Sequence, residues 1–254
     1  MIDDLLLEAQ NGLPKVFAEN CNAVLCTSDT LAKYLKKYNS KVYTFHTFID
    51  VNILDEIPET NYEKFTVAWA STGCFGRNII SEIIKKRNEL ELDFNIIAIG
   101  KYSNEFEGID GVITYPILPE SKMINVIKGA QLLLNPVVVN ENLKDDILKA
   151  CGNNLDDFIN SKSEIKYAIA GISKTCLLTS YRDRFIKVIK NNVNGILLED
   201  DPEKWIEEII YLYNNQDKSR IIAQNSYEDI KNNYDKSVVA EQLFNLFKEI
   251  VNEI

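Results

Sequence analysis

The sequence predicts an α/β protein with a Rossmann-like parallel sheet that carries helices on both faces. Two observations lead to this class. Segments typical of strands and of helices alternate along the 254 residues, which is the order in which parallel strands are connected. The strand segments are short and continuously apolar, as in FNIIAIG (Phe94–Gly100), because a strand in such a sheet is buried on both sides.

The first strand–helix–strand unit is expected between residues 22 and 45. NAVLCTS (Asn22–Ser28) and KVYTF (Lys41–Phe45) are typical of strands, and Ser28 or Asp29 can cap the helix between them. Residues 57–64 are polar and contain a proline, so they are expected to form a linker. A parallel sheet is therefore predicted on both sides of this linker.

A second α/β series follows the linker. Its helices are expected from about residue 77 to 90, 120 to 128, 162 onwards and 182 to 190, before three C-terminal helices, of which the last has one apolar stripe. The acidic segment 140–158 is predicted to be an insertion or a lid. The expected strands are Phe65–Ser71, Phe94–Gly100, Gly111–Ile117, Gln131–Val138, Thr175–Thr179 and Ile196–Glu199.

Composition excludes several function classes. The net charge of -10 and the pI near 4.8 argue against a nucleic-acid partner. The five cysteines include no CxxC pair, and His46 is the single histidine, so no metal site or histidine-centred triad is expected. No apolar run is long enough to span a bilayer, and the N-terminus is acidic where a signal peptide is basic. These features predict a cytoplasmic protein, with peripheral membrane association left open.

The segment Asn160–Ser180 predicts a phosphate site. Ser161 and Glu164 have the spacing of a capping box, which starts a helix at about Lys162. The free amides of the first turn and the helix dipole attract anions, and Lys162 and Lys166 lie within the first turn and a half. The alternative is a capped surface helix with solvated lysines.

Two further stretches lie where strands are expected to end. The loop from Gly73 to Arg77 contains two glycines but matches neither GxGxxG nor a P-loop, and a βα turn that requires glycine dihedrals is the alternative. Asn135-Pro136 ends the strand at the carboxyl edge of the sheet, where ligands of open α/β folds bind.

SKSEIKY, the strand after it, NNVNGILLE and the helix around Trp205 together resemble the donor-binding half of the two-Rossmann (GT-B) glycosyltransferases. Among these enzymes, the sequence most resembles the retaining group-one or family-four type. The resemblance is sharpest between Ala130 and Trp205. It implies a partial acceptor-domain βαβ unit (1–56), the linker (57–64), a nucleotide-sugar donor-binding domain (65–235) and a C-terminal crossing helix (236–254). Compared with a complete enzyme of this type, the resemblance implies an N-terminally truncated chain.

The resemblance also implies a donor site without a cofactor or metal, in which helix amides and cations hold the diphosphate of a UDP- or GDP-linked sugar. The family's glutamate pair falls on Ser161 and Ile169, and its glycine-x-proline on Lys174-Thr175-Cys176, so both motifs are altered. No catalytic residue is assigned. The donor-binding residues expected are Gly73, Arg77, Asn135, Ser161, Lys162, Ser163, Glu164 and Lys166.

The function expected from this resemblance is transfer of a sugar from a nucleotide sugar to a polysaccharide, lipid-linked or protein acceptor. The alternative is a non-catalytic nucleotide-sugar-binding or assembly subunit, which Ile169 favours. A sugar epimerase or dehydrogenase is disfavoured, because its glycine fingerprint and Tyr-x-x-x-Lys are missing. A homodimer or a partner chain is expected to cover the exposed sheet edge of the N-terminal unit. The nucleotide, the sugar, the acceptor and the anomeric outcome stay open.

Overall fold

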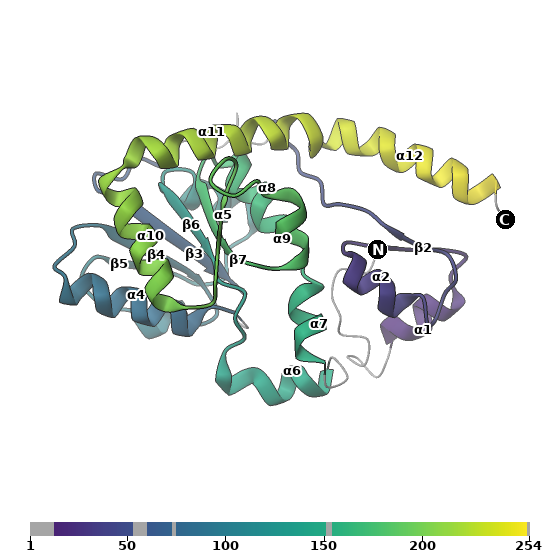
Figure 1. Cartoon of the computed structure of the whole chain (residues 1–254), viewed down its shortest axis with the longest axis horizontal. Coiled ribbons are helices and arrows are strands. Elements are labelled where there is room, and N and C mark those ends of the chain that lie inside the picture. Colours follow the sequence, from purple (N-terminus) through teal and green to yellow (C-terminus); the bar gives the residue numbers. More distant parts are fainter. Residues whose placement is uncertain (1–12, 53–59, 73–74, 151–153, 253–254) are drawn as a thin grey trace.

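The computed structural model describes residues 13–52, 60–72, 75–150 and 154–252. They form a large unit around a six-stranded sheet and a small unit around a two-stranded sheet (Figure 1). Every strand pair in both sheets is parallel, as the alternation in the sequence predicts.

The large sheet has the strand order β5-β4-β3-β6-β7-β8. The chain therefore begins in the middle, adds β4 and β5 on one side, and then returns to add β6, β7 and β8 on the other. This doubly wound order is the one typical of Rossmann folds. The strands are β3 (Thr66–Ser71), β4 (Asn95–Gly100), β5 (Val112–Tyr115), β6 (Leu132–Asn135), β7 (Cys176–Ser180) and β8 (Ile196–Leu198).

Helices cover both faces of this sheet, which explains why its strands are continuously apolar. Along β3, Ala68 and Ala70 face one core while Val67 and Trp69 face the other. The helices around the sheet are α4 (Arg77–Glu89), α5 (Glu120–Ile127), α8 (Ile165–Ile172), α9 (Asp183–Val188), α10 (Pro202–Asn214) and α11 (Gln216–Asn233), with the short η2 (Ser103–Phe106) after β4.

The small unit contains α1 (Leu13–Asn20), β1 (Val24–Cys26), α2 (Asp29–Leu35) and β2 (Val42–Thr44). The Ser28 hydroxyl accepts a hydrogen bond from the Leu31 amide at 3.2 Å, which confirms the predicted cap. Its core continues into the large unit, because Phe158 belongs to the same buried cluster. The two units therefore pack against each other.

The acidic segment after β6 is helical, with η3 (Glu141–Leu143), α6 (Lys144–Ala150) and α7 (Leu155–Asn160). It lies between the two units in Figure 1, and Asp157 on α7 accepts a hydrogen bond from Tyr34 on α2. The predicted insertion is therefore a folded connector between the large and the small unit.

The last helix, α12 (Lys236–Asn252), continues from α11 toward the small unit (Figure 1). An ion pair of 2.5 Å joins Lys236 to Asp50, and His46 hydrogen-bonds Gln242 at 3.0 Å. The expected apolar stripe is only partly covered. Val239 and Ile250 are buried, whereas Phe247 and Val251 are exposed, as is the neighbouring Phe244.

Candidate functional site

The carboxyl ends of β3 and β6 mark the point where the strand order reverses. The connections after these two strands run to opposite sides of the sheet, which leaves a crevice between them, and open α/β folds bind their ligands there. Ser71 and Asn135 are the last residues of these strands.

A cavity of about 480 Å³ occupies this position. Its polar lining comes from the ends of β3 and β6, the start of α5 and the start of α8. Its apolar lining comes from β3, from the loops after β3 and β6 and before α5, and from α5, α8 and α9. The lining residues are Trp69, Ala70, Ser71, Thr72, Phe75, Leu118, Glu120, Met123, Asn135, Pro136, Val137, Lys162, Ser163, Ile165, Lys166, Ile169 and Phe185.

The start of α8 differs from the predicted capping box. The helix begins at Ile165 with Glu164 as its N-cap residue, three positions later than expected, and the Glu164 carbonyl accepts from the amides of Tyr167 and Ala168. Ser161 instead ends α7, and its hydroxyl donates to the Phe158 carbonyl at 2.8 Å. The capping box and the helix start at Lys162 were therefore wrong.

The reason lies in the side chain of Glu164, which is fully buried. Both of its oxygens accept hydrogen bonds from the Arg184 guanidinium at 2.6 Å, and one also accepts from the Thr47 amide at 3.1 Å. A bidentate pair with arginine is stronger than a bond to a single backbone amide. The carboxylate is therefore committed to α9 and to the loop after β2, and it does not face the cavity.

Lys162 and Lys166, two of the residues expected to bind the donor, both line the cavity. The ammonium of Lys162 lies 3.7 Å from the centre of the Phe158 ring and 5.0 Å from that of Phe75, so two aromatic faces hold it. Lys166 is partly exposed, and burial of its amine lowers its pKa to about 8. Ser163 lies between them in the lining.

The backbone at this helix start adds to the two lysines. The first amides of an α-helix have no intrahelical partner, and the helix dipole makes this end positive. α8 is eight residues long and begins beside the cavity. Amides and ammonium groups thus converge on one volume, which suits an anion that carries more than one negative charge.

The other predicted donor-binding residues differ in whether they line the cavity. Asn135 lines the cavity, where its amide donates to the Thr179 hydroxyl at 2.9 Å. Arg77 lies outside the lining, because its guanidinium pairs with Glu105 at 3.0 Å and stacks on the Tyr102 ring. Ser161 and Glu164 are buried away from the lining. Gly73 lies outside the described residues.

Sequence reasoning missed several lining residues. Ser71 ends β3 and Thr72 follows it, and the rule that ligands bind at the carboxyl edge would have found both. Glu120, at the start of α5, carries the one carboxylate among the described lining residues. Ile169 is the position at which the resemblance implies a glutamate of the family's pair. It lines the cavity with 3% of its surface exposed.

The part of the chain that the structure describes contains neither a cluster of metal-ligating side chains nor a membrane-spanning helix. No group of three or more histidine, cysteine, aspartate or glutamate side chains is arranged to hold a metal ion within residues 13–52, 60–72, 75–150 and 154–252. None of the helices that the structure describes has the length and apolar content needed to cross a bilayer.

The architecture is similar to that of solved glycosyltransferases. Anabaena HepE in complex with UDP-glucose matches with a TM-score of 0.72 and 12% identity, covering 98% of this chain and 71% of HepE. A variant of S. aureus TarM, in complex with fondaparinux, α-GlcNAc-glycerol and UDP, matches with a TM-score of 0.69 and 14% identity, covering 94% and 48%. A glycosyltransferase from Rickettsia africae matches with a TM-score of 0.67 and 11% identity, covering 93% and 66%.

These likenesses show that the chain has the fold of the GT-B glycosyltransferases. The chain spans less than half the length of TarM and about two thirds of the length of the other two proteins. In sequence, no family model and no curated protein matches it.

Proposed function

We propose that the chain binds a nucleotide sugar in the cavity at the carboxyl edge of the large sheet. We further propose that it acts in transfer of the sugar to a polysaccharide, lipid-linked or protein acceptor. The observation that carries the proposal is the convergence of Lys162, Lys166 and the start of α8 on one cavity at the point where the strand order reverses.

This arrangement fits the chemistry of glycosyl transfer. When the bond between the sugar and the diphosphate breaks, negative charge grows on the leaving phosphate. Fixed cations and helix amides stabilise that charge without a metal ion. Because burial lowers the pKa of Lys166 to about 8, a bound diphosphate would draw a proton onto this amine and hold it charged. Lys162 is already positioned by the rings of Phe158 and Phe75.

UDP is the nucleotide to test first. HepE was solved with UDP-glucose and with UDP and glucose, and TarM with UDP. GDP is the second, because the cavity's described residues include no feature that selects a base. The sugar would face Asn135 and the end of β3, where the polar lining continues.

One observation favours a second function, that of a non-catalytic nucleotide-sugar-binding or assembly subunit. Ile169 offers no acceptor for a ribose hydroxyl, and Glu164 is bound to Arg184. Glu120 is then the carboxylate left, among the described lining residues, to hold a hydroxyl or to assist the reaction. A binding subunit requires the diphosphate contacts but not a reactive carboxylate.

A calorimetric titration separates binding from no binding. The full chain is titrated with UDP, GDP, UDP-glucose, UDP-N-acetylglucosamine, UDP-galactose and GDP-mannose, and thermal unfolding is followed in parallel. A ligand at a hundredfold excess over its Kd stabilises the folded state by about 2.7 kcal/mol. Lys231→Met, an exposed position in the last turn of α11, is the control for loss of one positive charge. No heat and no stabilisation with any of the six compounds would contradict the proposal.

Turnover separates the two functions. If the chain is an enzyme, the bound nucleotide sugar is slowly cleaved and free nucleoside diphosphate accumulates, and Glu120→Gln slows this release while the nucleotide still binds. If the chain is a binding subunit, the donor binds but no nucleoside diphosphate is released, with or without candidate acceptors.

A further inference from the structure

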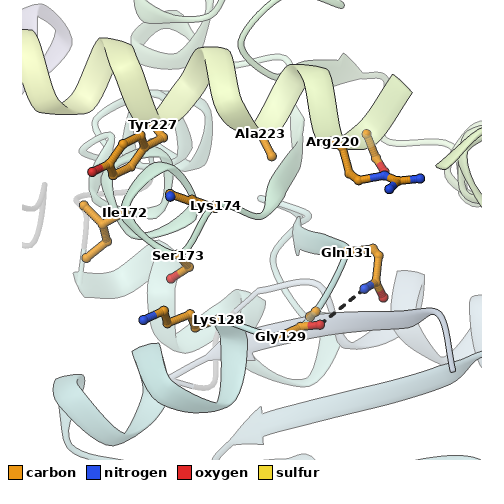
Figure 2. A pocket seen from close by; sticks show the side chains of 11 residues that line it. Lys128, Gly129, Gln131, Ile172, Ser173, Lys174, Arg220, Ala223 and Tyr227 are labelled. Atoms are coloured by element: carbon orange, nitrogen blue, oxygen red, sulfur yellow. Dashed lines mark hydrogen bonds between the residues drawn. The ribbon is translucent and has the colours of Figure 1, made fainter. Parts of the chain in front are cut away.

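A second pocket, of about 310 Å³, lies at the opposite edge of the large sheet. It is bounded by the end of α5, the start of β6, the end of α8 and the first half of α11 (Figure 2). Gln131 lines it just before β6, whereas Asn135 at the other end of β6 lines the candidate donor cavity. The two sites are therefore separate.

We call this pocket the amino-edge pocket, because it lies at the amino ends of the strands. Three basic side chains line it, although the chain as a whole has a net charge of -10. Figure 2 shows Lys128 and Lys174 on one side and Arg220 on the other. The Arg220 guanidinium pairs with Asp217 at 2.6 Å, but its side chain is 71% exposed, so this pair is weak and can rearrange. No acidic residue is present among the described lining residues.

Ser173 supplies an independent sign of a missing ligand. It lines the pocket with only 2% of its surface exposed, and its hydroxyl has no hydrogen-bond partner within the described chain. A buried hydroxyl without a partner costs free energy, so native proteins rarely keep one without a reason. A ligand oxygen in the pocket would accept its proton.

Lys174 occupies a backbone position that favours glycine. Its φ of +51° lies in the left-handed region, directly after α8. The Thr175 amide donates to the Ala170 carbonyl and the Lys174 amide to the Gly171 carbonyl, both at 3.0 Å, which is the usual glycine-ended helix stop. The lysine side chain instead extends over the Tyr227 ring at 4.5 Å. Backbone conformation alone would not select a lysine here.

Helix electrostatics accounts for part of this arrangement. Lys128 and Lys174 follow the carboxyl ends of α5 and α8, where a cation offsets the negative end of the helix dipole. That effect explains the charges. It explains neither the unpartnered Ser173 hydroxyl nor the choice of lysine over glycine in a left-handed position.

We propose that the amino-edge pocket binds the phosphate group of a small phosphorylated compound. The Ser173 hydroxyl donates to a phosphate oxygen, and the ammonium groups of Lys128 and Lys174 neutralise its charge. The volume of about 310 Å³ is at the small end of ligand pockets, which suits a phosphorylated monosaccharide or inorganic phosphate. The site is independent of the donor cavity and does not rest on the proposed transferase function.

The test titrates the full chain with inorganic phosphate and with a hexose 6-phosphate. Ser173→Ala and Lys174→Gly are each expected to weaken binding about fivefold or more, the scale of one lost hydrogen bond or ion contact. Lys166→Met in the donor cavity and Lys231→Met on the outer end of α11 are expected to leave Kd unchanged. Lys174→Gly also relieves the left-handed lysine, so it should unfold at a higher temperature, and weaker binding in this variant cannot come from unfolding.

Three outcomes would overturn the proposal: no binding of either probe, equal affinity in all four variants, or weaker binding in Lys166→Met alone, which would place the anion in the donor cavity. Tighter binding of the hexose 6-phosphate than of inorganic phosphate identifies the ligand as a phosphorylated sugar. Equal affinity identifies it as phosphate itself. Nucleotide binding that depends only on Lys166 does not change this result, so the proposals for the two sites are tested independently.

Discussion

The two ends of α8 carry the same kind of residue in opposite electrostatic settings. Lys166 lies in the first turn, at the positive end of the helix dipole, and burial lowers its pKa to about 8. Lys174 follows the last turn, at the negative end, and is exposed. The first lysine is placed where helix and burial both disfavour its charge, and the second where the helix favours it.

This difference separates stabilising from functional charges. A cation at a helix carboxyl end helps the fold, so its presence alone says little about a ligand. A half-buried cation at a helix amino end destabilises the free protein and is retained only if something else requires it. The donor cavity therefore has the stronger claim to an anionic ligand, and the amino-edge pocket depends on Ser173 and on the backbone of Lys174.

The largest expected effect comes from removing the buried ion pair between Glu164 and Arg184 at the amino end of α8. Glu164→Ala leaves the Arg184 guanidinium, which is only 13% exposed, without its carboxylate, and removal of one partner of a buried pair typically costs about 3–5 kcal/mol. Urea denaturation measures the loss. The double variant Glu164→Leu with Arg184→Met should recover much of it, because no buried charge remains. A loss for Glu164→Ala below about 1 kcal/mol would show that the pair does not fix this helix end.

Replacing the cation at the amino end tests its function directly. Lys166→Met is expected to weaken UDP binding by about 10-fold to 100-fold, or ~1–3 kcal/mol, because one charge-assisted contact is lost. Thermal stability should rise, since the folded chain no longer has to bury an amine. Calorimetry and a thermal melt of the same sample give both values, with Lys231→Met as the matched control. Unchanged affinity, or a fall in stability, would make Lys166 a structural residue.

The pH dependence of donor binding follows from the same amine. Free Lys166 has a pKa of about 8, and a bound diphosphate raises it, so binding takes up a proton at alkaline pH. The affinity should be fully present below about pH 7 and fall about tenfold between pH 7 and pH 9, as the free amine loses its charge. Titrations across this range in wild type and in Lys166→Met provide the check. A slope of equal size in the variant would assign it to another group.

The smallest effect is expected at the carboxyl end. Lys174→Gly should raise the free energy of unfolding by about 1 kcal/mol, because glycine adopts the left-handed conformation without strain. Asn192→Gly is the comparison, since Asn192 has a φ of +62° but asparagine tolerates this region, so its gain should be smaller. Equal gains in chemical denaturation would mean that the lysine itself carries no particular cost.

Much of the fold was determined by local sequence. Seven of the eight described strands lie within the predicted segments and β7 runs one residue past its segment, to Ser180, because each segment combines an apolar run with a nearby turn or cap. The Ser28 cap was likewise predicted, and it depends on residues no more than three apart. The same holds for the part of the candidate site that flanks a strand end or a helix start, although the pattern placed that helix start three residues too early. These residues are Asn135, Lys162, Ser163 and Lys166.

Only the tertiary structure decided where the longer side chains are used. Glu164 has the spacing of a capping residue, but it pairs with Arg184 from another helix, because a buried bidentate contact is stronger than a cap. Arg77 ends a glycine-bearing loop that was expected to approach the diphosphate, yet it pairs with Glu105. The amino-edge pocket joins the loop between α5 and β6, the end of α8 with the two residues after it, and α11, and no local pattern marks it. Short-range hydrogen bonds and periodicity are written in neighbouring residues, whereas the partners of long charged side chains depend on how the helices pack.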